Sequence, residues 1–166
     1  MDPVRRRVLA DGLVAGFLAY VVVVVFVSAV DLLASRSPFF TVSLLGELLL
    51  HSTDAPGDAI DAGAVISYNG IHLAAFLILG FVAAWLAHET ELHPWLWYVA
   101  FFLLLAAFLY AFSALLVVDQ AVSAAIPAWM LGVATLLGWA TVVGWLIAAR
   151  RRRAAAEATE PATFDI

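Results

Sequence analysis

The sequence predicts an all-α integral membrane protein, built as a four-transmembrane-helix bundle with a short interfacial amphipathic helix between the first and second spans. Hydrophobic residues make up 65% of the 166 residues and charged residues 13%, whereas a soluble domain is about half apolar and about a quarter charged. The apolar residues come in four long runs, and a helix needs ~20 residues to cross the hydrocarbon layer of a bilayer. Seven of the eight basic residues, all arginines, lie near the two ends of the chain.

The expected spans lie within one membrane domain, residues 1–153, followed by a loosely ordered cytoplasmic tail, residues 154–166. The arginines before the first run are compatible with a signal peptide, but the run is longer than the apolar core of such a peptide. We therefore expect an uncleaved first span. Prolines precede the last two runs, where the first turn of a helix tolerates them. If the last span begins near Val122 instead, Pro127 kinks it. The expected spans are 8–33, 64–87, 95–118 and 127–149.

The connection between the first two spans contains an apolar segment, residues 38–51, that is too short to cross a membrane. On a helix, Ser43, Glu47 and His51 form one polar line with a spacing of four residues. The leucines face away from this line, as in a helix that lies in the membrane interface with its apolar side toward the hydrocarbon. These leucines are Leu44, Leu45, Leu48 and Leu49.

The distribution of arginines predicts the orientation of the chain. Basic residues in short flanking segments concentrate on the cytoplasmic side of a membrane. The two terminal flanks hold seven arginines and the opposite side holds one, Arg36. We therefore expect a cell (inner) membrane protein with its N- and C-termini in the cytoplasm. Trp85, Trp95, Trp97 and Tyr98 surround the connection 88–93 on the same side, as an aromatic belt would.

Four pairs of small residues at a spacing of four indicate where helices approach one another closely. Lipid supplies no hydrophobic force between helices, so close backbone packing has to hold them together. We expect these pairs to pack the bundle, and the alternative is that one of them binds another subunit. The pairs are Gly12 with Gly16, Gly70 with Ala74, Gly80 with Ala84, and Ala140 with Gly144.

The best candidate for a chemical site is His72 in the second span, with Tyr68 and Asn69 on the same helix face. A polar group inside a membrane is costly unless it has a partner, and a histidine there is a functional hypothesis by default. It could ligate haem or copper, or donate a hydrogen bond to a quinone. Because the spans offer no obvious second ligand, the favoured interpretation is structural. In it, His72 forms a hydrogen bond to a carbonyl of a neighbouring helix.

Two weaker groupings contain carboxylates and imidazoles, which suit zinc, iron or copper. Glu47 and His51 could approach His72, with aspartates of the following loop nearby. This spacing is not a recognised ligand motif, so a solvated polar face is favoured. His88 and His93 flank two glutamates and could bind metal or sense pH, but a polar cytoplasmic turn is the favoured interpretation. The aspartates of the loop are Asp54, Asp58 and Asp61.

Three aspartates lie near the ends of spans. Asp31 and Asp119 are expected to end helices at the water boundary. A four-span aspartyl signal peptidase has about this length, but its Asn- and Gly-rich motifs are absent around these two residues. Small multidrug transporters also have four spans and a membrane acid. Here Asp11 is shallow and close to Arg7, and the arginine bias argues against dual topology.

Several function classes are excluded or disfavoured. The chain has no cysteine, which excludes disulfides and thiolate metal sites. It has no phosphate loop, zincin motif or serine elbow, and no basic stripe for nucleic acid. We expect a non-catalytic accessory subunit of a larger bacterial or archaeal membrane complex, such as a respiratory or other energy-transducing assembly, with lipid and other integral subunits as partners. The alternatives are a small haem- or quinone-binding redox protein centred on His72, and a small proton-coupled transporter that uses Asp11 or His72.

Overall fold

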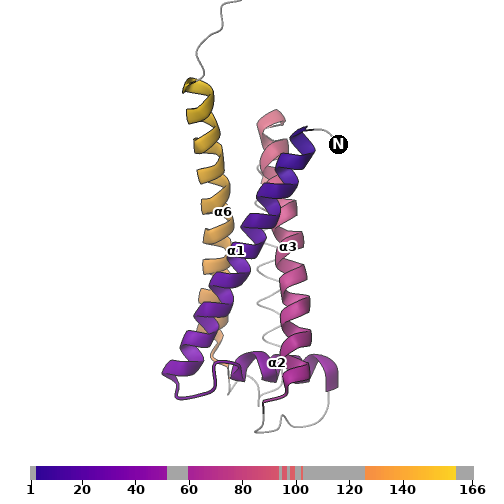
Figure 1. Cartoon of the computed structure of the whole chain (residues 1–166), viewed down its shortest axis with the longest axis vertical. Coiled ribbons are helices and arrows are strands. Elements are labelled where there is room, and N and C mark those ends of the chain that lie inside the picture. The colour runs from indigo at the N-terminus through magenta and orange to yellow at the C-terminus, as the bar shows by residue number, and fades with distance from the viewer. Residues whose placement is uncertain are drawn as a thin grey trace, which may run out of the picture.

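The computed structural model describes residues 3–51, 60–93, 95–96, 98–99, 102 and 126–159, and the all-α prediction is confirmed for them. Three of the helices are long and apolar enough to cross a membrane, and the fourth is short. The long helix α1 lies against both of the other long helices, while the short helix crosses one end of the bundle (Figure 1). The helices are α1 (Pro3–Leu33), α2 (Phe40–His51), α3 (Ala62–Leu92) and α6 (Ala128–Thr159).

The two ends of the bundle differ. The start of α1, the end of α3 and the end of α6 lie together at one end, which we call the arginine end (Figure 1). The opposite end, which we call the α2 end, holds α2, the start of α3 and the start of α6. Most of the predicted span 95–118 falls outside the described residues. The helix ends that flank it, Leu92 and Ala128, lie at opposite ends of the bundle.

Two helices run further than the sequence patterns predict. The predicted turn 88–93 is helical as far as Leu92, and the His93 N–H closes the helix by donating to the Glu89 carbonyl over 2.8 Å. Helix α6 continues through the arginines to Thr159, so residues 154–159 of the predicted tail are helical. Alanine, arginine and glutamate all favour a helix, and neither segment contains the glycine or proline that usually ends one. Residues 160–166 lie outside the description.

Helices α1 and α3 cross with their backbones in contact. A Cβ atom at Gly12 would lie 2.7 Å from the Phe81 Cα, and one at Gly16 would overlap the Phe76 carbonyl oxygen. Gly80 faces both α1 glycines in the same way. Only residues without a Cβ fit at these three positions, as in helix crossings of the small-xxx-small type.

The remaining small residues of the predicted pairs differ in whether they contact another described helix. Ala84 continues the α1–α3 crossing and is buried. Within the described residues, Gly70 and Gly144 have no atom within 4 Å of the position of a Cβ, and Ala74 and Ala140 are exposed. Among the described helices, therefore, the predicted pairs that make close contact are Gly12 with Gly16 and Gly80 with Ala84.

Asp31 anchors α2 to the end of α1. We expected this residue at the water boundary, but its side chain is only 2% exposed. Its carboxylate accepts hydrogen bonds from the Thr41 N–H over 3.0 Å and from the Thr41 hydroxyl over 2.8 Å. The first N–H groups of a helix have no partner within that helix. Asp31 therefore supplies, from ten residues upstream, the acceptor that the start of α2 needs.

The polar line of α2 is partly buried, contrary to the prediction of a solvated face. Ser43 is 3% exposed, and its hydroxyl donates to Glu47 and accepts the Asp61 N–H over 3.0 Å. Asp61 in turn caps α3 by accepting the Gly63 N–H. Of the four leucines that were expected to face the hydrocarbon, three pack against the bundle and Leu49 is exposed. The three are Leu44, Leu45 and Leu48. The polar line thus joins α2 to α3.

Two clusters of buried apolar residues fill the bundle. The cluster near the α2 end joins α1, α2 and α6, and the other joins α1 to α6 nearer the arginine end. Phe76 of α3 packs against both clusters and so connects them. The first consists of Val23, Val27, Leu44, Ile126, Met130 and Ala134, and the second of Ala15, Ala19 and Val142.

The α1–α3 crossing predicts unequal effects of adding one methyl group. Gly16→Ala places a Cβ against the Phe76 carbonyl, and overpacking typically lowers the free energy of unfolding by about 1–3 kcal/mol. The matched control is Gly144→Ala, where the added Cβ meets no described atom within 4 Å and the helix gains roughly 1 kcal/mol of propensity. Denaturant titration of the purified protein in detergent compares the two. A Gly16→Ala variant as stable as Gly144→Ala would contradict the crossing.

Candidate functional site

A cavity of about 270 Å³ lies between α1, α2, α3 and α6. Most of its walls are aliphatic or aromatic. Residues of α2 close it on one side, which places the cavity toward the α2 end of the bundle. The polar side chains on its walls are Thr41, Tyr68, Asn69, His72, Thr135 and the indole of Trp139. The three residues singled out from the sequence of the second span therefore share one cavity.

The imidazole of His72 is surrounded by aromatic rings. Tyr68 stacks on it with ring centroids 5.2 Å apart, and Phe76 meets it edge-on at 4.9 Å. Tyr68, His72 and Phe76 follow one another at a spacing of four residues, which places them on one face of α3. Tyr20 of α1 lies tilted against the imidazole, with a centroid distance of 6.3 Å. The aromatic contacts hold the His72 ring at the cavity wall.

Asn69 joins α1 to α3. Its amide nitrogen donates to the Val65 carbonyl over 2.9 Å, and its amide oxygen accepts the Tyr20 hydroxyl over 2.9 Å. Both polar ends of this side chain therefore have partners inside the bundle. Sequence reasoning missed Tyr20, although it is the one tyrosine of the first expected span, 8–33, and its hydroxyl among apolar residues is a signal that could have identified it.

The structural interpretation of His72 predicted a hydrogen bond to a neighbouring helix. In the part of the chain that the structure describes, no hydrogen bond joins the His72 side chain to another residue. Thr135 on the opposite wall bonds the Leu131 carbonyl of its own helix. His72 thus lies on a cavity wall with its ring positioned by neighbours and its polar atoms without a described partner.

The predicted metal grouping is not assembled among the described residues. Glu47 accepts the Ser43 hydroxyl, and Asp61 caps α3. No group of three or more histidine, aspartate or glutamate side chains that could hold a metal ion is found within the described residues. The side chain of His51 and the loop residues Asp54 and Asp58 lie outside them, as does Asp119.

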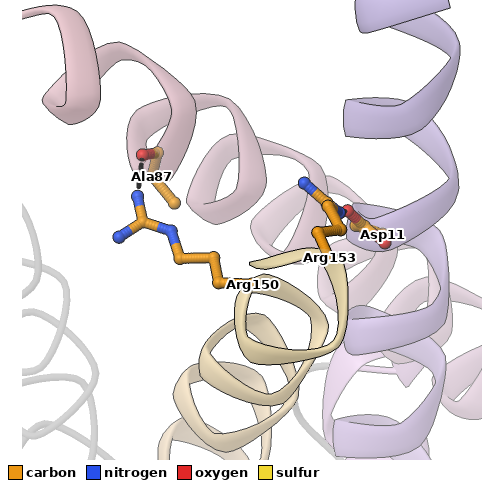
Figure 2. Close-up of polar contacts among 4 residues, drawn as sticks. All are labelled: Asp11, Ala87, Arg150 and Arg153. Carbon is orange, nitrogen blue, oxygen red and sulfur yellow. Dashed lines mark hydrogen bonds and ion pairs between the residues drawn. The ribbon is translucent and has the colours of Figure 1, made fainter. Parts of the chain in front are cut away.

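Asp11, the candidate transport acid, lies at the arginine end and has a basic partner. Figure 2 shows its carboxylate in an ion pair with Arg153 of α6, while Arg150 donates to the Ala87 carbonyl of α3. These two contacts tie the end of α6 to α1 and α3. A proton-coupled transporter needs an acid that binds and releases protons during transport, and an ion pair that fastens two helices suits that role poorly.

No protein-family model, curated protein or solved structure matches this chain. The site is therefore interpreted from its own chemistry. An apolar cavity with a few converging polar groups is the usual form of a small-molecule site. The imidazole of His72 and the hydroxyl of Tyr68 can donate hydrogen bonds, and the surrounding rings can pack against a planar molecule.

Proposed function

We propose that the protein binds a lipid-soluble molecule of the quinone class in the cavity beside His72. The observation that carries the proposal is the His72 ring, which is held between Tyr68 and Phe76 on the cavity wall without a hydrogen bond to another described residue. A polar group in the hydrocarbon layer is costly unless it is partnered. A quinone carbonyl accepts the hydrogen bond that the imidazole offers, and its ring packs against aromatic side chains.

The size and lining of the cavity favour a quinone over haem. Its volume of about 270 Å³ is just below the range of ~300–1,000 Å³ found for small-molecule sites, which suits a single-ring headgroup better than a macrocycle. The aliphatic walls contributed by α1 and α6 suit an isoprenoid tail. Haem ligated by His72 is the alternative, and an absorption spectrum distinguishes the two.

Replacing His72 with alanine should weaken quinone binding about tenfold, because one hydrogen bond in a water-poor site contributes roughly 1.4 kcal/mol. The assay is titration of the purified protein in nanodiscs with a short-tailed quinone, followed by calorimetry. His93→Ala is the matched control, since His93 is exposed at the end of α3. Equal affinity of the two variants contradicts the proposal, and a Soret band lost in His72→Ala would identify haem instead.

A second proposal is that the protein is a non-catalytic accessory subunit of a larger membrane complex, such as an energy-transducing one. It is supported by the pair of Gly70 and Ala74 on α3, which is exposed among the described residues: a Cβ at Gly70 would meet no described atom within 4 Å. Such a pair lets a helix of another subunit approach closely. We propose other integral membrane subunits and lipid as the partners.

The accessory role predicts stoichiometric co-purification with other subunits from native membranes in mild detergent. Gly70→Leu should lower the yield of partner subunits severalfold while leaving the chain folded, because a Cβ at this position meets no atom of the described residues within 4 Å. Mass spectrometry of the eluate measures the yield. Recovery of the wild-type chain alone, as a monodisperse species with its own turnover, would rule out this role.

We also propose that the arginine end faces the cytoplasm in the cell (inner) membrane. The start of α1 and the end of α6 lie at that end (Figure 1) and carry seven arginines, whereas Arg36 packs over the ring of Phe40 at the start of α2. This imbalance follows the rule for cytoplasmic flanks.

The orientation can be tested by labelling, because the chain has no cysteine of its own. Ser35→Cys, at the α2 end, should react with a membrane-impermeant maleimide in intact cells. Ala158→Cys, near the end of α6, should react only after the cells are permeabilised. The reverse pattern would overturn the orientation, and labelling of both sites in intact cells would contradict an even number of spans.

A further inference from the structure

A second pocket, of about 440 Å³, lies at the arginine end between α1, α3 and α6. It is separate from the cavity beside His72 and shares no lining residue with it. Its polar wall comes from all three helices. The charged or ionisable side chains on it are Arg7, Asp11, His88, Arg150 and Arg153.

The polar wall carries an excess of positive charge. Three guanidinium groups and one carboxylate line the pocket among the described residues, which gives a formal charge of +2 with His88 neutral. The carboxylate of Asp11 forms an ion pair with Arg153, and Arg150 donates a hydrogen bond to the Ala87 carbonyl (Figure 2). These contacts fix two arginines at the wall and leave more cationic than anionic groups facing the pocket.

The rest of the pocket is apolar. Valines of α1, alanines of α3 and a leucine of α6 form this part of the wall. The pocket lies at the ends of three helices that are long and apolar enough to cross a membrane, where the hydrocarbon meets the headgroups. An occupant must therefore combine a negative charge with an apolar portion. The apolar residues are Val4, Val8, Ala84, Ala87, Leu146 and Ala154.

We propose that this pocket binds the phosphate headgroup of an anionic membrane lipid. Guanidinium groups bind phosphate oxygens through paired, charge-assisted hydrogen bonds, and basic pockets between membrane helices bind anionic headgroups. Arg7 and Arg150 receive the phosphate, and the valines and Leu146 contact the glycerol and the upper acyl chains. A free phosphate ion shares the headgroup chemistry, but it makes no use of the apolar wall.

The test is lipid binding to the delipidated full-length chain in detergent, measured by native mass spectrometry. Phosphatidylglycerol should bind more tightly than phosphatidylcholine with the same acyl chains. Arg7→Gln should weaken phosphatidylglycerol binding about fivefold, the value that corresponds to the ~1 kcal/mol typical of one arginine near an anionic lipid surface. Arg6→Gln, one residue earlier and outside the pocket lining, is the matched control and should bind like the wild type.

A second pair of variants and a competitor complete the test. Arg150→Gln should weaken binding, whereas Arg151→Gln, which does not line the pocket, should not. Equal binding of the two lipids, or equal losses in Arg6→Gln and Arg7→Gln, overturns the proposal. Displacement of phosphatidylglycerol by millimolar inorganic phosphate identifies a site for the free ion and overturns the lipid assignment. Because Arg7 is exposed, the thermal unfolding midpoint of Arg7→Gln should equal that of Arg6→Gln, which separates loss of binding from loss of fold.

Discussion

The arrangement of this protein depends on the backbone contact between α1 and α3. Gly16 lies against the Phe76 carbonyl, and Gly80 lies against Gly12, so the two helices approach more closely than helices with side chains at these positions could. One turn beyond Gly16, the same approach brings the Tyr20 hydroxyl within 2.9 Å of the Asn69 amide oxygen. The contact that holds the bundle together therefore also builds the wall on which the His72 ring is positioned.

The two ends of the bundle are held by polar contacts of different kinds. At the α2 end, buried Asp31 holds the start of α2, and Ser43 joins α2 to the cap of α3. This closes the cavity beside His72. At the arginine end, α6 is fastened through charged side chains, Arg153 to Asp11 and Arg150 to a backbone carbonyl. Polar groups that lie between helices need partners within the protein, and both networks supply such partners from a neighbouring helix.

The chemical class of each proposed ligand is inferred from the polar groups and the apolar residues that line its pocket. Beside His72, a ring held by aromatic contacts faces an otherwise apolar cavity, which suits an uncharged molecule with a hydrogen-bond acceptor. At the arginine end, guanidinium groups face an apolar wall where the long helices end, which suits a charged headgroup with a hydrocarbon tail. The two pockets share no residue, so each proposal can fail without affecting the other.

The sequence by itself determined the helical class, the approximate positions of three long apolar helices, the clustering of arginines and the shared face of Tyr68, Asn69 and His72. These features depend on composition and on periodicity within a single helix, and both can be read along the chain. Only the tertiary structure decided that Gly16 is packed against α3 while Gly144 meets no other described residue, that Asp31 is buried, and that Tyr20 donates a hydrogen bond to Asn69. The reason is that such contacts depend on the crossing point and rotation of one helix relative to another, and small-residue pairs of equal spacing on several helices allow many crossings.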